Sequence, residues 1–198
     1  AFCSPLGLLR CAPLCDYLWL KSFMDKTDKI YVAGHEGLVG SAILRRLQRD
    51  GFLNIVTRRH QELDLCDQSQ VKAFFESERP DYVFLAAAKM GGVFANNTYR
   101  ADFIYENLMI QSNVLHQSFL SEVKKLLFLS SADVYPKKSS APLKESDLLS
   151  GGFEETCEPY AVAKLAGIKL CESYNRQYGT DFVVVIAPNV YGHHQHYD

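Results

Sequence analysis

The sequence predicts an α/β fold in which a doubly wound parallel β-sheet carries helices on both faces. From residue 29 onward, short apolar segments alternate with longer segments of helical spacing. Such alternation is typical of βαβ units, whose right-handed crossovers make their strands parallel. A glycine-rich turn follows the first apolar segment. The 198 residues are 47% hydrophobic and 22% charged, an ordinary composition for a domain with one core.

Apolar runs and glycines mark the first two strands and the helix between them. Residues 30–33 form a short apolar run, which predicts a buried strand. Residues 37–50 carry apolar side chains at helical spacing, and Gly51 follows as a helix stop. The run at 53–57 predicts the second strand.

Helix and strand signals continue to alternate after residue 66. Asp67 is a suitable N-cap for a second helix, which must end before Pro80. Residues 82–86 predict the third strand. The remaining elements are expected to be a helix at 101–121, a strand at 126–130, a polar loop at 136–158, a helix at 159–178 and a strand at 182–187.

Three glycines with GxxGxxG spacing stand between the first predicted strand and helix. The first glycine permits a tight turn, the second lets the backbone approach a pyrophosphate, and the third allows close helix–strand packing. A phosphate would then rest on the free N–H groups at the helix start. At the first βα junction this pattern favours a Rossmann-type dinucleotide site over a merely tight turn. The expected cofactor contacts here are Gly34, His35, Glu36, Gly37, Leu38, Val39 and Gly40.

The residues after the second predicted strand bear on the choice of cofactor. NAD sites usually have an acidic residue here, whereas Arg58 suits the 2′-phosphate of NADP(H). The alternative is a solvated surface pair formed by Arg58 and Arg59. Asp64 and Leu65 fall where a contact to adenine is expected.

A serine, a tyrosine and a lysine form a candidate catalytic triad. Tyr160 and Lys164 are four residues apart, which places them on one face of a helix. A nearby ammonium lowers the pKa of a phenol, which can then exchange a proton with a carbonyl oxygen. Ser131 ends the fourth predicted strand, at the sheet edge where open α/β proteins bind ligands. The alternative for the Tyr–Lys spacing alone is an exposed helix pair.

Several segments are much more specific than the glycine turn or the Tyr–Lys spacing. They are VAGHEGLVGSAI (32–43), FLAAAKMGG (84–92), ANNTYRADFIYEN (95–107), KLLFLSS (125–131), EPYAVAKLAGIKLCESYNRQYG (158–179) and PNVYG (188–192). In these segments the chain resembles the GDP-L-fucose synthases, the GDP-4-keto-6-deoxy-D-mannose 3,5-epimerase/4-reductases of the extended short-chain dehydrogenase/reductase family. The resemblance runs from residue 29 to about residue 194.

The resemblance implies a two-stage reaction on a GDP-sugar. An acid/base pair inverts C3 and C5 beside the C4 ketone, and NADPH then delivers hydride to C4. Tyr160 matches the proton donor, Lys164 the residue that tunes it and contacts the ribose, and Ser131 the residue that positions the oxygen. His194 matches the epimerisation acid, and Asp133 stands at the position of the epimerisation base. The histidine cluster at 193–196 could instead be a chance run; a metal tract is not expected, and no metal site is predicted, because no further ligands with suitable spacing occur.

Further contacts and the assembly also follow from the resemblance. It implies a homodimer through the helices at 101–121 and 159–178, which carry apolar residues on more than one side. It adds cofactor contacts at Ala86, Ala87, Ala88, Pro188, Asn189 and Val190.

Two positions depart from the family pattern. The family has Ser-Ser-Cys after the fourth strand, and its cysteine is the epimerisation base, whereas this chain reads Ser131-Ala132-Asp133. Related dehydratases carry Asp–Glu at the last two positions, so Asp133 resembles them and Ala132 does not. The family also has an arginine in the glycine turn, where this chain has Glu36, which leaves Arg58 to favour NADP(H).

The chain is expected to comprise a segment outside the fold, one domain and the start of another part. Residues 1–23 hold half of the six cysteines and lack a basic n-region, which argues against a signal peptide. We expect an extraneous leader at 1–23, a Rossmann domain at 24–187 and the start of a truncated substrate-binding part at 188–198. A chain that stops there is expected to be inactive by itself.

Composition excludes several other classes of protein. The formal net charge is −2 and no block of basic residues occurs, which argues against a nucleic-acid partner. No apolar run reaches the about 20 residues that span a bilayer, which argues against a membrane partner. Scattered cysteines without paired spacing fit a reducing cytoplasm.

Two other functions remain open at this point. One is a related reductase, epimerase or dehydratase acting on a different nucleotide sugar. The other is a non-catalytic protein that senses the cofactor on the same fold, against which the presence of Tyr160 and Lys164 argues.

Overall fold

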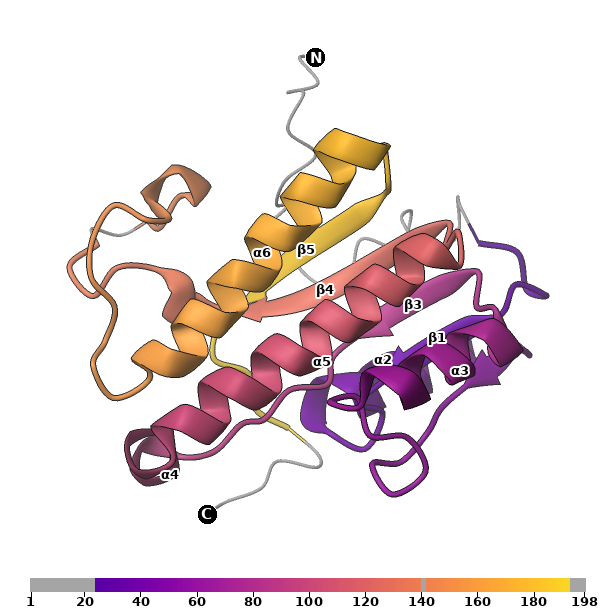
Figure 1. The fold of residues 1–198 in the computed structure, drawn as a ribbon, viewed down its shortest axis with the longest axis horizontal. Helices are drawn as coiled ribbons and strands as arrows, with labels where there is room; N and C mark the ends of the chain where they lie inside the picture. Colours follow the sequence, from indigo (N-terminus) through magenta and orange to yellow (C-terminus); the bar gives the residue numbers. More distant parts are fainter. Residues whose placement is uncertain (1–23, 140–141, 193–198) are drawn as a thin grey trace.

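The structure, a computed structural model, describes residues 24–139 and 142–192 (Figure 1). The predicted leader at 1–23 and His194 therefore lie outside the described residues. The described chain forms a five-stranded, all-parallel sheet in the order β2-β1-β3-β4-β5, which confirms the predicted fold class. The strands are β1 (Ile30–Ala33), β2 (Ile55–Val56), β3 (Tyr82–Leu85), β4 (Lys125–Ser131) and β5 (Phe182–Ala187).

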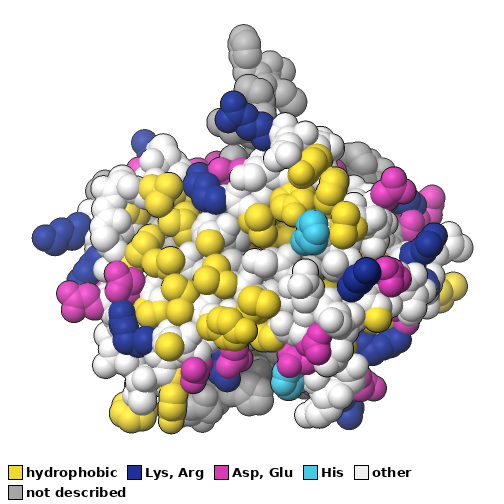
Figure 2. All heavy atoms as spheres, viewed as in Figure 1, with side chains coloured by type: hydrophobic (Ala, Val, Ile, Leu, Met, Phe, Trp, Pro, Cys, Tyr) yellow, Lys and Arg dark blue, Asp and Glu magenta, His cyan; other side chains and the backbone are white. Residues whose placement is uncertain are grey.

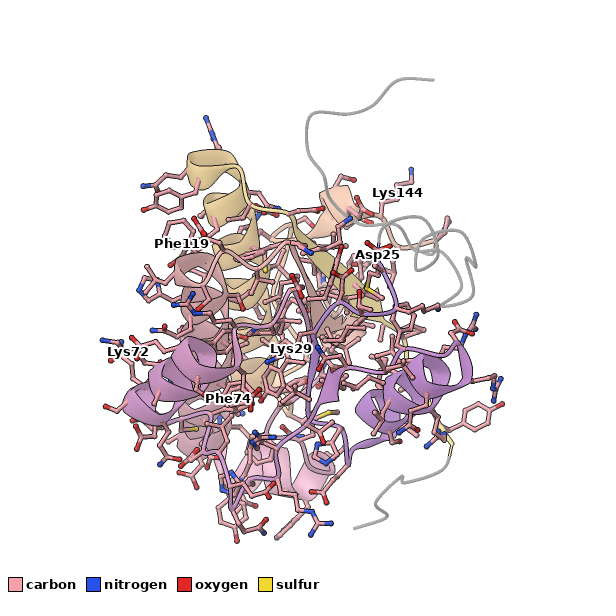
Figure 3. The ribbon with its side chains drawn as sticks, turned by 90° about the vertical axis from the view of Figure 1, so that its right-hand side faces the viewer. Asp25, Lys29, Lys72, Phe74, Phe119 and Lys144 are labelled. Carbon is pink, nitrogen blue, oxygen red and sulfur yellow. The ribbon has the colours of Figure 1, made fainter. Side chains whose placement is uncertain are left out.

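Helices cover both faces of the sheet, as a doubly wound fold requires. The helices are α2 (Leu38–Arg49), α3 (Gln68–Glu78), α4 (Val93–Thr98), α5 (Arg100–Leu120) and α6 (Glu158–Tyr178). Figure 1 shows α3, α5 and α6 in front of the sheet. Figure 3, turned by 90°, shows α3, with Lys72 and Phe74, on one side of the strands and α2 on the other.

Each face of the sheet has its own apolar core, because successive strand residues point to opposite faces. In β1, Ile30 and Val32 join the core beneath α2, which includes Leu47. Tyr31 and Ala33 join the larger core beneath α3, α5 and α6. All four β1 residues are at most 1% exposed. Burial of alternating residues in two cores therefore fixes the register of this central strand.

The direction of winding reverses between β1 and β3. From β1 the chain passes through α2 to β2 on one side, and then through α3 to β3 on the other side of β1. Open α/β sheets bind ligands at such a switch point, outside the carboxyl ends of the strands. The glycine turn lies at this place, directly after β1.

Several element boundaries follow from local capping. The Asp67 carboxylate accepts hydrogen bonds from the backbone N–H groups of Ser69 (2.8 Å) and Gln70 (3.1 Å), which confirms it as the N-cap of α3. Pro159 lies in the first turn of α6, and Gly179 ends that helix with a φ of +70°. These residues match the positions where proline and glycine favour a helix start and a helix end.

The structure differs from the sequence expectation in two elements. The strand expected at 53–57 is limited to Ile55–Val56, because β2 pairs with only the first half of β1. The short helix α4 was not predicted, since none of its residues is buried and its apolar side chains follow no helical stripe. Two short 3₁₀ helices, η1 (Ala132–Val134) and η2 (Glu145–Asp147), follow β4. Among the described residues, no helix is long and apolar enough to cross a membrane.

Candidate active site

The glycine turn brings backbone so close to backbone that two of its positions exclude any side chain. Gly34 has a φ of +81°, and a Cβ there would lie 2.6 Å from the backbone N of Ala87, beyond β3. A Cβ on Gly40 would lie 2.0 Å from the carbonyl oxygen of Gly34. Gly37 is the N-cap of α2 and supplies no side-chain cap. The first N–H groups of α2 are therefore left for an anion at the positive end of the helix dipole.

This turn fits a dinucleotide. Its glycines leave the backbone bare, as close approach of a pyrophosphate requires. Nδ1 of His35 is buried and has no hydrogen-bond partner within the described ranges, so the turn also holds a polar atom without a protein contact. Leu38 begins α2, and Gly192, which follows β5, lies beside it: a Cβ on Gly192 would be 3.4 Å from Leu38 Cδ1.

The two arginines after β2 have different surroundings. Arg58 pairs with Glu78 at the end of α3, and its guanidinium lies 5.6 Å from the ring centre of Phe74. Glu78 also pairs with Lys29, which precedes β1. Arg58 therefore reaches back toward the amino ends of the strands, away from the glycine turn. This placement differs from the expected contact of Arg58 with a 2′-phosphate.

Arg59, by contrast, faces the glycine turn. Its Nε lies 3.2 Å from Oε1 of Glu36, and both side chains are well exposed. The ion pair joins the residue after β2 to the middle of the turn, where the adenosine ribose of a dinucleotide lies in this fold. Of the two arginines, the structure thus places Arg59 beside the turn, and a two-residue strand gives little sequence signal of which side chain faces which way.

Buried amide side chains hold the loops that flank the turn. Asn107 of α5 bonds to both the N–H (3.0 Å) and the carbonyl (2.9 Å) of Lys89, just beyond Ala86, Ala87 and Ala88. Asn113 donates to the carbonyl of Leu65 at 2.9 Å, and the Asp64 carboxylate accepts from the N–H of Cys66 at 2.8 Å. Sequence analysis missed Asn107 and Asn113. The available signal was that each amide falls among the apolar positions of a predicted helix, where a polar side chain needs a hydrogen-bond partner.

The carboxyl ends of β4 and β5 bring the predicted catalytic residues to the same edge. Ser131 pairs with Ala187, so Pro188, Asn189 and Val190 begin beside it. The Ser131 hydroxyl donates to Oδ2 of Asp133 at 2.7 Å. Asp133 lies in η1, which packs against α6. The first residues beyond β4 are thus tied to the helix that carries Tyr160.

Tyr160 and Lys164 are both buried on the inner side of α6. Tyr160 is 5% exposed, and burial, with the charge of Asp133 in addition, raises the pKa of its phenol. Lys164 is 3% exposed, and its Nζ lies 5.9 Å from the ring centre of Tyr160. This Nζ donates to the carbonyl of Leu129 at 2.9 Å. Burial lowers the pKa of Lys164 to about 7.

Cys157, which sequence analysis did not single out, also lies in this cluster. It is the N-cap residue of α6, three residues before Tyr160. Burial, together with the neighbouring charges of Asp133 and Glu154, raises the pKa of its thiol to about 11. The thiol is therefore protonated at neutral pH. It donates a hydrogen bond to the backbone carbonyl of Glu154 at 3.6 Å. The sequence signal that could have pointed to Cys157 was its position just before the predicted helix that carries Tyr160.

The buried lysine predicts an unusual dependence of folding on pH. The unfolded chain has the ordinary lysine pKa of about 10.4 and so binds more protons than the folded chain above pH 7. The contribution of Lys164 to the free energy of unfolding should therefore rise between pH 7 and 10, by up to about 1.4 kcal/mol per pH unit. Denaturant unfolding at several pH values, compared with Lys164→Met, measures this. Parallel curves for both proteins would contradict it.

Residues 30–198 match the profile of the family described as "NAD dependent epimerase/dehydratase family". The chain belongs to the NAD-dependent epimerase/dehydratase family. Within this family, it is 55% identical over 170 residues to the GDP-L-fucose synthase of Escherichia coli, covering 86% of this chain and 53% of that relative. The resemblance to GDP-L-fucose synthases is thus confirmed. The chain spans about half the length of the curated relatives that it matches.

Solved structures of other NAD-dependent epimerase/dehydratase proteins share this fold with a bound cofactor. One is MlghC, a GDP-mannoheptose C4 reductase from Campylobacter jejuni with NADP bound, at 50% identity and a TM-score of 0.83, covering 85% of this chain and 53% of that chain. Another is a GDP-L-fucose synthetase from Naegleria fowleri bound to NADP, at 30% identity and a TM-score of 0.79, covering 86% and 56%. Relatives with this fold therefore include both reductases and fucose synthases.

Proposed function

We propose that the protein containing this chain reduces the C4 ketone of a GDP-sugar with NADPH. The observation that carries the proposal is the cluster of Ser131, Tyr160 and Lys164 at the carboxyl edge of the sheet, next to a turn that fits a dinucleotide. The first substrate to test is GDP-4-keto-6-deoxy-D-mannose, since a relative at 55% identity is a GDP-L-fucose synthase. The two carbons beside such a ketone are C3 and C5.

The buried phenol is suited to act as the proton donor. When bound, NADPH would supply the hydride that converts the ketone carbon into an alcohol carbon. Tyr160 would give its hydroxyl proton to the ketone oxygen, and Lys164 would stabilise the phenolate that remains. Ser131 would hold the same oxygen by a hydrogen bond. Pro188, Asn189 and Val190 would border the nicotinamide side of the site, and Ala86, Ala87 and Ala88 the pyrophosphate side.

Asp133 favours reduction with little or redirected epimerisation over the complete synthesis of GDP-L-fucose. It stands where the fucose synthases have a cysteine base, and its carboxylate is engaged by the Ser131 hydroxyl. MlghC, at 50% identity, is described as a C4 reductase. If Asp133 and His194 together do invert C3 and C5, the product is GDP-L-fucose.

Product analysis of the full-length protein in heavy water tests the function. With GDP-4-keto-6-deoxy-D-mannose, we expect NADPH to be oxidised and a 4-hydroxy sugar to form, with little deuterium at C3 and C5. Rapid exchange at both carbons that is lost in Asp133→Ala would establish a competent epimerase. If the protein binds NADPH but reduces neither GDP-4-keto-6-deoxy-D-mannose nor the ketones of GDP-heptoses, this result would favour a cofactor-sensing protein.

The preference for NADPH is expected to depend on Arg59. An arginine–phosphate hydrogen bond contributes about 1.5–3 kcal/mol, so Arg59→Ala should weaken binding of NADPH by about 10–100-fold and leave binding of NADH nearly unchanged. Arg58→Ala is the matched control, because Arg58 pairs with Glu78 instead. Glu36→Gln should tighten NADPH binding, since it removes a carboxylate near the phosphate. Titration of both cofactors by fluorescence measures these affinities. If Arg58→Ala alone abolished the preference for NADPH, Arg58 rather than Arg59 would be the residue that contacts the 2′-phosphate.

We also propose a homodimer through α5 and α6. Figure 2 shows apolar side chains gathered on the face that these helices form. Tyr105, Leu120 and Tyr178 of this face are all more than half exposed. Light scattering of the full-length protein at micromolar concentration should give twice the monomer mass, and a monomer would refute the proposal.

The cytoplasm is the compartment that we propose. Cys66, Cys157 and Cys171 are free thiols in the structure, as expected in a reducing environment.

A further inference from the structure

A buried glutamine of α5 bonds to the turn of α6 that carries Lys164. Gln111 is 2% exposed, and its Nε2 donates to the carbonyl of Ala163, the residue before Lys164, at 2.6 Å. We propose that Gln111, which lies in the space left by Gly167, is a positioning residue that holds Lys164 against β4. The proposal rests on the proposed function, because that function gives Lys164 its role in ketone reduction.

The amine of Lys164 contacts two residues of β4. Its Nζ donates to the carbonyl of Leu129 at 2.9 Å and lies over the ring of Phe128, 4.8 Å from the ring centre. Both β4 residues are paired with neighbouring strands, so the sheet fixes where these two contacts are made. Lys164 is 3% exposed, and its side chain makes both contacts only while α6 keeps its distance from β4 and its rotation about its own axis.

A glycine gives the glutamine and the phenylalanine room beside α6. Gly167 lies four residues after Ala163 in the interior of the helix, where glycine is less favourable than alanine. A Cβ there would lie 2.7 Å from Oε1 of Gln111 and closer still to the ring of Phe128. The missing side chain therefore lets α5 bring an amide, and β4 a ring, to the same place on α6.

The hydrogen bond from Gln111 acts on the body of α6. In an α-helix the carbonyl of Ala163 already accepts the N–H of Gly167, and the amide of Gln111 uses the second lone pair of that oxygen. Because a carbonyl oxygen only accepts, the nitrogen of the amide must face it. Figure 1 shows α5 and α6 side by side in front of the sheet, and the two helices are in contact. The bond therefore opposes sliding and rotation of α6 at the residue next to Lys164.

Stability of the fold does not account for this glutamine. Oε1 of Gln111 is buried and has no hydrogen-bond partner among the described residues. A buried acceptor without a partner costs free energy, whereas an apolar side chain of similar length does not. Ala163 would keep its helical hydrogen bond without Gln111. We therefore expect Gln111→Met to lower Tm by no more than roughly 4 °C, although the hold on Lys164 is lost.

The kinetic test compares Gln111→Met with the unchanged full-length protein, using NADPH and GDP-4-keto-6-deoxy-D-mannose. A displacement of about 1 Å can cost about 100-fold in rate, so kcat for reduction should fall by about 10–100-fold. KM for the sugar should change by less than about two-fold, because no contact with the sugar is removed. Added to Lys164→Met, the same substitution should have little further effect on kcat, because it acts through the amine.

An NMR signal of Lys164 tests the positioning without any reaction. Protons that lie over an aromatic ring are shielded by its ring current, so the Cε protons of Lys164 should resonate upfield of those of exposed lysines. Lysine labelled with ¹³C at Cε shows these signals in the full-length protein, and Lys164→Met identifies the one from Lys164. In Gln111→Met this signal should move toward that of an exposed lysine. Gly167→Ala, which pushes on Gln111 and Phe128 from α6, should also move it and serves if Gln111→Met does not fold.

Gln117→Met is the matched control. Gln117 is another buried amide of α5, but it borders a cavity beside Gln68 of α3, so its loss should change neither kcat nor the Lys164 signal. An unmoved Lys164 signal in the folded variants would overturn the proposal, and so would an equal loss of kcat in the control. If the protein reduces no GDP-ketosugar, the proposed function fails, whereas the NMR signal still decides whether Gln111 positions Lys164.

Discussion

Tyr160→Phe is expected to lower kcat for ketone reduction by about 10²–10⁴-fold, the usual effect of losing a general acid. Phenylalanine keeps the buried ring, which is 5% exposed, and removes only the hydroxyl that would protonate the ketone oxygen. Binding of NADPH should change by no more than a few-fold, because the glycine turn is untouched. Stopped-flow measurement of NADPH oxidation separates the chemical step from binding.

The control for this variant is Tyr99→Phe, which removes a hydroxyl from a tyrosine between α4 and α5 that is 55% exposed. It should leave kcat unchanged. If Tyr160→Phe also kept most of the activity, another group would donate the proton, and the assignment of the triad would be wrong. A large loss of NADPH binding would instead point to a role of the hydroxyl in holding the cofactor.

Gly34→Ala is expected to destabilise the fold and prevent cofactor binding. Its positive φ costs an alanine about 1–2 kcal/mol, and the new Cβ would lie 2.6 Å from backbone N of Ala87. Overpacking of this kind costs about 1–3 kcal/mol more. For a chain of this size, a loss of about 2–5 kcal/mol lowers Tm by roughly 4–20 °C. Calorimetry and NADPH titration measure the two effects.

Gly51→Ala separates backbone strain from the clash. Gly51 has nearly the same φ, +80°, but a Cβ there would meet nothing within 4 Å. It should therefore show the cost of the positive φ alone and leave NADPH binding intact. Equal destabilisation by the two substitutions would mean that the contact between Gly34 and Ala87 relaxes easily.

Most of the fold could be predicted from the sequence, because the side chains that face each core recur at the regular spacing of a strand or a helix. The apolar run of β1 and the helical spacing of α2 are local sequence patterns, and the structure forms the predicted element at each of them. β2 was predicted too long because its ends depend on pairing with β1, a contact that no local pattern encodes. The same holds for α4, which has no buried face.

The residues of the candidate site were easier to predict than the directions in which their side chains point. Neighbouring arginines differ only in which way they point, and in the structure Arg58 takes Glu78 as its partner while Arg59 takes Glu36. Cys157 escaped notice because it comes near Asp133, 24 residues earlier in the chain, only through the tertiary fold. Such contacts are set by the packing of η1 on α6 rather than by any spacing in the sequence.

The short turn η1 lies at the boundary between the hydrogen-bonded sheet and the less buried residues that follow it. Ser131 belongs to the β4–β5 ladder, so its place is part of the folding of the sheet. Ala132 and Asp133 lie just outside that ladder and only half-buried, so exchanging them places little demand on the fold. Substitutions at these two positions are therefore expected to change the chemistry of the sheet edge at little cost to the free energy of unfolding, while the position of Ser131 stays fixed by the ladder.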